Sequence, residues 1–227
     1  SSNLDLVPLS NIVLGGNGLS RNIKVTPLPN QFGAATITLT VTDPGGSSSS
    51  DTFLLTVRPV NDAPAASAQT LNTAEDTALS ITLGGSDVDG DTLAFAVTSP
   101  PTQGQLLGNA PNLIYIPNAN SHGSDSFNFS VTDADNVMAV AAIAITVTPV
   151  NDAPVAANQS VTTNEDTSTV IALGASDVDG DTLTFTVVTP PGHGTLSGTG
   201  SSVTYAPAAD FNGSDSFTFK ATDPSAA

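Results

Sequence analysis

The sequence predicts an all-β fold made of tandem seven-strand β-sandwiches arranged end to end. Three observations predict it: a 90-residue internal repeat, apolar residues at every second position within the repeat, and clusters of Gly, Pro, Asn and Asp between these stretches. No stretch shows the apolar spacing of an amphipathic α-helix, so we expect the regular structure to consist of strands.

The repeat is the strongest pattern in the chain. The motif VNDAP occurs at 60–64 and again at 150–154, and the motifs EDT, SDVDGDTL and GSDSF recur at the same spacing of 90 residues. Self-similarity at a fixed period indicates tandem structural units. We therefore expect a partial repeat (its C-terminal part) at 1–60, a complete repeat at 61–150, and a repeat that lacks its last strand at 151–227.

The phase of the repeat places both ends of the sequence inside a repeat. Residue 1 corresponds to Asp91, and residue 227 corresponds to Val137. We therefore expect either a window of a longer array or a subunit whose ends are completed by a neighbour.

Apolar alternation predicts seven strands in the complete repeat. About seven short strands in about 90 residues are typical of an immunoglobulin-like sandwich. Phe127 and Phe129 are expected to be buried, and Phe217 and Phe219 repeat them in the next copy. The expected strands are 68–73, 79–84, 92–98, 104–108, 112–116, 125–132 and 139–149.

Charge and composition exclude several partners. The chain has 21 Asp and Glu against four Lys and Arg, a net charge of -17. This surface repels nucleic acids and anionic lipids but attracts divalent cations, so no nucleic-acid partner is expected. There is no Cys for a disulfide or thiolate site, and no apolar run approaches the roughly 18 residues of a membrane span.

Carboxylates are expected to gather at the two VNDAP linkers. Alternate loops of a sandwich lie at the same end, so Asp87, Asp89 and Asp133 should lie near the linker residues Asn61 and Asp62. The Glu-Asp pair at 75–76 should lie at the opposite end and face the next linker. Clustered oxygen ligands without nitrogen or sulfur suit Ca²⁺. Asp and Gly are also common turn formers, so a plain turn is the alternative for DVDGD, whose spacing does not fit an EF-hand.

Together these motifs resemble cadherin repeats, and more closely the cadherin-like, immunoglobulin-like repeats of giant bacterial surface proteins and adhesins. The shared features are the NDAP linker, the Glu-Asp pair, the D-x-D of SDVDGD and the Thr-Asp that ends the sixth strand. The L-D-R-E motif of cadherins is absent. The resemblance implies Ca²⁺ between successive domains, with the following ligands: Asn61, Asp62, Asp87, Asp89 and Asp133 at one linker, and Glu75, Asn151, Asp152, Asp177, Asp179 and Asp223 at the other.

These observations favour an extracellular, calcium-stiffened structural or adhesive stalk, or a surface filament, of a secreted bacterial protein. Its expected partners are neighbouring repeats or copies of the same protein, and surface glycans are a further candidate. The alternative function is a polysaccharide-binding module, although the chain has no Trp and only 5% aromatic residues. No nucleophile–base motif is present, so we do not expect an enzyme. His122 and His193 fall at different repeat positions, which disfavours a paired imidazole site.

Overall fold

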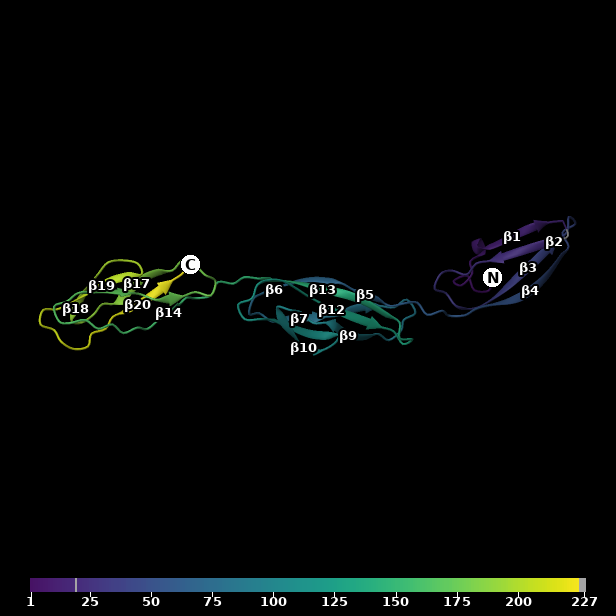
Figure 1. Ribbon diagram of the computed structural model, residues 1–227. Helices are drawn as coiled ribbons and strands as arrows, with labels where there is room; N and C mark the ends of the chain where they lie inside the picture. The colour runs from purple at the N-terminus through teal and green to yellow at the C-terminus, as the bar shows by residue number, and fades with distance from the viewer. Residues whose placement is uncertain (19, 225–227) are drawn as a thin grey trace. The chain divides into compact units, whose positions relative to one another are not determined.

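The computed structural model describes residues 1–18 and 20–224 (Figure 1). In this part of the chain the regular structure consists of β-strands and one 3₁₀ turn, Leu9–Asn11, as the apolar alternation within the repeat predicted. None of its helices is long or apolar enough to cross a membrane. The chain divides into two compact units: the first unit is Ser1–Leu71, Ala78–Ile116 and Ser124–Thr146, and the second unit is Asn72–Thr77, Pro117–Gly123 and Val147–Ala227.

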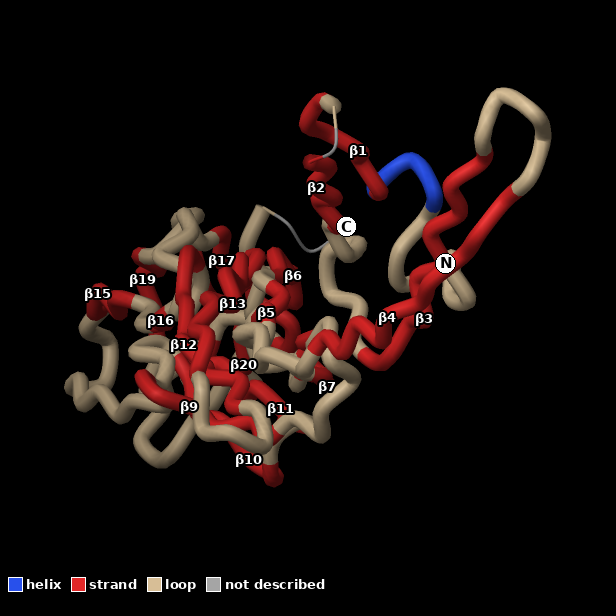
Figure 2. Tube along the Cα trace, turned by 90° about the vertical axis from the view of Figure 1, so that its right-hand side faces the viewer, coloured by secondary structure: helices blue, strands red, loops and turns tan. Residues whose placement is uncertain are grey.

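The first unit begins with two antiparallel hairpins. β1 (Ile12–Asn17) pairs with β2 (Ser20–Val25), and the longer β3 (Gly33–Thr42) pairs with β4 (Ser48–Val57), as Figure 2 shows. Every second residue of β3 faces a small core, so Ala35 and Ile37 are buried together with Leu6 and Val7.

Most of the remaining first unit is a sandwich of two main sheets. One sheet has the order β10 (Gly104–Asn109), β11 (Asn112–Pro117), β7 (Leu79–Thr82). The other has the order β6 (Gln69–Ala74), β13 (Met138–Thr148), β12 (Gly123–Thr132), β9 (Ala94–Ser99). The seven predicted strands are confirmed to within two residues at each end. A short extra pair, β5 (Ala65–Ser67) with β8 (Gly84–Ser86), was not predicted, because neither segment alternates apolar and polar residues.

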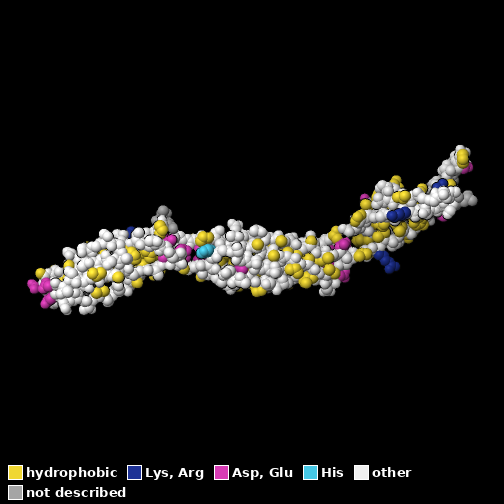
Figure 3. All heavy atoms as spheres, turned by 45° about the horizontal axis from the view of Figure 1, so that its top comes forward, with side chains coloured by type: hydrophobic (Ala, Val, Ile, Leu, Met, Phe, Trp, Pro, Cys, Tyr) yellow, Lys and Arg dark blue, Asp and Glu magenta, His cyan; other side chains and the backbone are white. Residues whose placement is uncertain are grey.

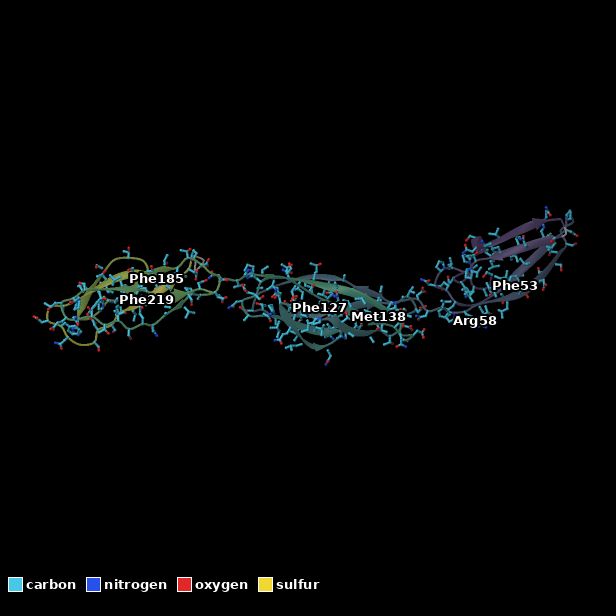
Figure 4. All side chains as sticks on the ribbon, viewed as in Figure 1. Phe53, Arg58, Phe127, Met138, Phe185 and Phe219 are labelled. Carbon is cyan, nitrogen blue, oxygen red and sulfur yellow. The ribbon has the colours of Figure 1, made fainter. Side chains whose placement is uncertain are left out.

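Side chains from β12 and β13 form the centre of this sandwich. Phe127, Phe129 and Val131 of β12 are at most 1% exposed, and Ile143 and Ile145 of β13 are at most 2% exposed. Phe127 is labelled in Figure 4. Complete burial of one such side chain stabilises a fold by about 1.5–3 kcal/mol. The two central strands therefore contribute a large share of the stability of this sheet.

The second unit contains the same strand types in smaller sheets. β15 (Thr169–Ala172), β19 (Ser202–Pro207) and β18 (Gly194–Ser197) form one sheet around the buried Ile171, Leu173 and Val203. β17 (Thr184–Thr189) pairs with β20 (Thr218–Thr222), and β14 (Val155–Ala156) pairs with β16 (Ala175–Ser176).

The expectation that Phe217 and Phe219 are buried is wrong, because both are only half-buried. Phe219 packs against Phe185 of the adjacent strand with ring centroids 6.2 Å apart (Figure 4). The sheet that carries Phe185 and Phe219 has two strands, whereas its counterpart in the first unit has four. No described strand of the second unit covers the rings as β13 covers Phe127 and Phe129.

Candidate metal centres at the two linkers

The first linker cluster lies in three segments between strands of the first unit. The linker precedes β5, the DVDGD loop joins β8 to β9, and an aspartate follows β12. The backbone N–H of Asp89 donates to Asp87 Oδ1 at 2.8 Å, and the N–H of Asp62 donates to Asp89 Oδ2 at 2.7 Å. These bonds attach the linker to the loop. The cluster consists of Asn61, Asp62, Asp87, Asp89, Asp91 and Asp133.

Asp133 is the most buried member of this cluster, at 6% exposed. Its Oδ2 accepts a 2.9 Å hydrogen bond from the Asn61 amide, and its Oδ1 accepts a 2.8 Å bond from the Val137 N–H. The Asn61 amide is the main reason that the pKa of Asp133 is lowered, so this carboxylate is held in its charged form. The pKa of Asp91 is raised, first by desolvation and then by the negative charges of Asp87 and Asp133.

The second linker cluster repeats these contacts 90 residues later, within the second unit. The N–H of Asp152 donates to Asp179 Oδ2 at 2.7 Å, and the N–H of Asp179 donates to Asp177 Oδ1 at 3.0 Å. The two copies of the sequence therefore fold into the same loop. This cluster consists of Glu75, Asp76, Asn151, Asp152, Asp177, Asp179, Asp181 and Asp223.

Two acidic residues from the turn after β6 belong to the second cluster. Glu75 is 3% exposed, and its Oε1 accepts a 2.6 Å hydrogen bond from the Val150 N–H. The Asn120 N–H donates to Asp76 Oδ1 at 3.2 Å. When the Asn120 amide is oriented to donate, its nitrogen lies 3.3 Å from Asp152 Oδ2 and 3.2 Å from Asp76 Oδ2. Asn120 thus links the turn to the linker.

Seven carboxylates influence one another in this cluster. The pKa of Asp152 is raised, first by desolvation and then by the negative charges of Asp179, Asp76, Glu75 and Asp177. The pKa of Asp181 is raised in the same way by desolvation and by Asp177, Asp179 and Asp223. Like charges at short range destabilise one another unless a cation is added. Figure 3 shows Asp and Glu side chains in small groups with uncharged surface between them.

One carboxylate oxygen in each cluster has no hydrogen-bond partner. Asp87 Oδ2 and Asp177 Oδ2 are both buried, and no described residue donates to either. A buried acceptor without a partner typically costs about 1–3 kcal/mol. The same orphaned atom therefore occurs twice, 90 residues apart, beside a set of oxygen ligands. Such a donor set fits Ca²⁺, which binds carboxylate and carbonyl oxygens.

Comparison with known families shows which family the chain belongs to. The profile of the family described as "Bacterial Ig domain" matches residues 61–146 and 151–227. This chain belongs to the bacterial Ig domain family. A search of curated proteins finds no match.

Solved structures with tandem cadherin domains are similar to these Ig domains. Human CDH23 EC21-23 is 16% identical with a TM-score of 0.56, and the alignment covers 93% of this chain and 74% of that one. Protocadherin gammaB7 EC3-6, solved as a cis-dimer, is 18% identical with a TM-score of 0.53, covering 94% and 62%. At these identities the likeness shows the fold alone, and that fold is cadherin-like.

An endo-fucoidan hydrolase of glycoside hydrolase family 107 is 22% identical over 95% of this chain, with a TM-score of 0.34. That score is too low to support an argument about either fold or activity. The Ig-domain chain spans 36% of the length of the hydrolase and 62% of the protocadherin gammaB7 structure.

The Ig domains bring most of the predicted ligands close to one another, but these residues do not form a complete coordination site. In residues 1–18 and 20–224, no three carboxylate or imidazole side chains converge closely enough to hold a metal ion. Asn151 also differs from Asn61, because its amide donates to the carbonyl of Asp152 at 3.2 Å and not to an aspartate side chain. The assignment of these residues as ligands is therefore a proposal.

Sequence reasoning missed the role of the aspartate in GSDSF. Asp125 is 7% exposed and accepts hydrogen bonds from the N–H groups of Thr102 (2.9 Å), Gln103 (3.0 Å) and Ser126 (2.8 Å) and from the Tyr115 hydroxyl (2.8 Å). The recurrence of both Asp and Tyr at the 90-residue spacing was the available signal. Tyr115 itself is completely buried, at 0% exposed, whereas its repeat counterpart Tyr205 is half-buried.

The second unit repeats this arrangement around Asp215, and we call each aspartate with its N–H and Tyr hydroxyl donors a carboxylate staple. Asp215 accepts hydrogen bonds from the N–H groups of Gly192 (2.9 Å) and His193 (2.8 Å) and from the Tyr205 hydroxyl (2.9 Å). Desolvation raises the pKa of Asp215, but these donors together with the Ser216 N–H outweigh it and lower the pKa to about 2. The staple is structural and lies outside both linker clusters.

Proposed function

We propose that this chain is part of an extracellular structural or adhesive array whose Ig domains bind Ca²⁺ at the linkers. Tandem Ig-like and cadherin-like domains are typical of extracellular proteins with such roles. The observation that carries the calcium proposal is the orphaned oxygen of Asp87 and of Asp177, each buried beside linker carboxylates. A plain turn would not need a buried acceptor without a donor, since buried polar groups are normally hydrogen-bonded.

The residues of each cluster have distinct tasks in this proposal. Asp87 and Asp177 present the free oxygens, and Asp89 and Asp179 hold the linker N–H groups and contribute a second carboxylate. Glu75 fixes the start of the second linker through the Val150 N–H. The bound cation supplies positive charge that offsets the repulsion among these carboxylates. With linker and loops bound to the same ion, the linker loses conformational freedom and the array becomes stiffer.

Copies of the same protein are the favoured partners, because an array of this kind presents identical surfaces repeatedly. Polysaccharide binding is the weaker alternative. Sugar-stacking sites need exposed aromatic rings, and among the described residues only Phe32 (58%) and Phe53 (38%) have more than a third of their surface exposed. A glycan array with the whole chain tests this alternative, and specific binding of one glycan class would favour it.

Calorimetric titration of Ca²⁺ into the chelator-treated chain tests the proposal. Asp87→Asn and Asp177→Asn keep the size and turn propensity of the side chain but remove its charge. We expect each variant to lose the heat of one cluster and to keep that of the other. Asp51→Asn, an exposed aspartate outside both clusters, is the control and should bind like the wild type. Absence of calcium binding, or equal binding by all three variants, would overturn the proposal.

A further inference from the structure

The loop that joins β3 to β4 contains an Asp-Pro peptide bond, between Asp43 and Pro44. The Gly46 N–H donates a 3.1 Å hydrogen bond to the Asp43 carbonyl oxygen, so residues 43–46 form a β-turn. Asp at the first position of such a turn, Pro at the second and Gly at the fourth are the preferred residues. All residues of the loop are exposed. The turn therefore presents the Asp43–Pro44 bond to solvent.

The same loop holds the Asp43 side chain. The Ser47 N–H donates to Asp43 Oδ1 at 2.9 Å, and the Asp43 N–H donates to the Ser47 carbonyl at 2.9 Å. The second carboxylate oxygen, Oδ2, takes no part in these bonds. Gly45 leaves room beside the carboxylate, because a Cβ at that position would lie 3.2 Å from Asp43 Oδ1. Asp43 thus keeps one carboxylate oxygen available for reaction with the carbonyl carbon of the same residue, and such a reaction closes a five-membered ring.

Two features of this peptide bond favour its cleavage by the side chain. The Pro44 nitrogen belongs to a tertiary amide and carries no hydrogen. It therefore cannot attack the Asp43 side chain with loss of a proton, which is the reaction that competes at other Asp peptide bonds. The Gly46 N–H donates to the oxygen on which negative charge develops when the carbonyl carbon is attacked. A donor already placed at that oxygen stabilises the transition state.

We propose that Asp43 cleaves the peptide bond that follows it, without a separate enzyme. Asp43 Oδ2 bonds to the Asp43 carbonyl carbon, and the bond from that carbon to the Pro44 nitrogen breaks as the nitrogen takes a proton from solvent. The products are a cyclic anhydride at Asp43 and a free amino group at Pro44. Water then opens the anhydride and leaves two carboxyl groups on Asp43, so the net reaction is hydrolysis of one peptide bond. Aspartate carboxylates also serve as nucleophiles in covalent catalysis.

The repeat supplies two comparisons for this bond. Asp133 occupies the same repeat position, and its Oδ1 accepts the N–H of Val137, four residues on, at 2.8 Å, but Ala134 follows it. Asp223 occupies the position once more and is followed by Pro224, but it is only 5% exposed. Proline and an exposed carboxylate therefore occur together in the first of these three loops.

A cut at this bond leaves the hairpin paired. β3 and β4 are joined by a ladder that runs from Gly33 opposite Val57 to Thr42 opposite Ser48. Both pieces therefore stay in place while the hairpin is folded, and they separate when its strands separate. The cleavage does not depend on calcium binding at the linkers, so its test is independent of the calcium proposal.

Incubation of the whole chain in mildly acidic buffer, followed by denaturing electrophoresis and mass spectrometry, tests the proposal. We expect one piece that ends at Asp43 and one that begins at Pro44, formed at least tenfold faster than the pieces from cleavage at Asp223–Pro224. The chain unfolded in urea should lose this preference, because both Asp-Pro bonds are then equally exposed. Absence of cleavage at Asp43–Pro44, equal rates at the two bonds in the folded chain, or cleavage at Asp43–Pro44 as fast in urea as in the folded chain would overturn the proposal.

Two substitutions identify the reacting groups. Asp43→Asn keeps an oxygen that can accept the Ser47 N–H but removes the carboxylate, and Pro44→Ala keeps the carboxylate but gives the following residue an N–H. We expect each substitution to slow cleavage at this bond at least tenfold, with circular dichroism as the check that each variant is folded. Asp51→Asn removes an exposed aspartate from β4 and should leave the rate unchanged. Cleavage of Asp43→Asn at the rate of the wild type would show that the carboxylate is not the nucleophile and would contradict the mechanism.

Discussion

The backbone N–H of Asp152 and the Oδ2 atom of Asp179 are joined by a 2.7 Å hydrogen bond, so the second linker is attached to its DVDGD loop by the protein itself. Asp62 and Asp89 form the same bond at the same length in the first unit. A cation bound near these carboxylates would therefore act on a linker that is already partly ordered, which reduces the entropy lost on binding.

Calcium is expected to raise the melting temperature of the chain, and Asp177→Asn/Asp179→Asn should reduce that rise. A ligand at a hundredfold excess over its Kd adds about 2.7 kcal/mol to stability if it binds only the folded state. Differential scanning calorimetry with and without Ca²⁺ measures the effect. The control is Asp5→Asn/Asp51→Asn, which removes the same charge elsewhere. If Ca²⁺ raised the melting temperature of both double variants equally, Asp177 and Asp179 would not be calcium ligands and DVDGD would be a plain turn.

Without calcium, the same substitutions at 177 and 179 should be neutral or slightly stabilising. They relieve repulsion on Asp152, whose pKa is raised in part by both aspartates. The Asp179 side chain also accepts a linker hydrogen bond, which the Asn oxygen can still accept. Urea unfolding in the presence of a chelator measures this difference. A loss of more than about 1 kcal/mol would show that the carboxylates hold the loop through contacts that do not involve a cation.

The Asp215 staple should resist acid. Its pKa is lowered to about 2 in the folded chain, against an ordinary value of about 3.9 in an unfolded one. Because the folded pKa is the lower one, the contribution of this group is complete above about pH 4 and is lost as the pH falls towards 2. Carboxyl-carbon NMR across this range should show Asp215 titrating at about pH 2. Titration near pH 4 would contradict the hydrogen bonds assigned to it.

Gly194→Ala should destabilise the second unit, and Gly174→Ala should not. A methyl group at Gly194 would meet the Tyr205 ring and would lie 2.7 Å from the Ala206 carbonyl oxygen, whereas one at Gly174 meets nothing closer than 3.5 Å. Overpacking of this kind typically costs about 1–3 kcal/mol. Thermal unfolding of the two variants gives a direct comparison. Equal stability would mean that Tyr205 moves aside, and the 2.9 Å hydrogen bond to Asp215 should then be lost.

The sequence predicted the strands well because two local signals agreed. Apolar alternation located β12 and β13, and turn residues located their ends. The half-burial of Phe217 and Phe219 could not be predicted from their own pattern, which matches that of Phe127 and Phe129. Burial depends on which strand lies beside a residue, and a local pattern does not show this.

The sequence indicated which residues belong to each candidate site, but it did not indicate the hydrogen bonds that they make. The 90-residue repeat and the resemblance indicated which acidic residues gather at each linker. Asn61 and Asn151 lie in identical VNDAP motifs, yet one donates to Asp133 and the other to the next carbonyl along the chain. The orphaned oxygens of Asp87 and Asp177 depend on side-chain placement as well. Contacts of this kind depend on the packing of distant segments, which no local motif specifies.

The position of β13 also bears on when an Ig domain of this kind can fold. It is the last strand of its repeat in sequence, yet it lies between β6 and β12 in the sheet. A domain that emerges gradually, from a ribosome or through a membrane pore, cannot close this sheet until its final residues have appeared. Closure of this sheet is therefore a late event in the folding of the domain, because β6 and β12 are joined only through β13.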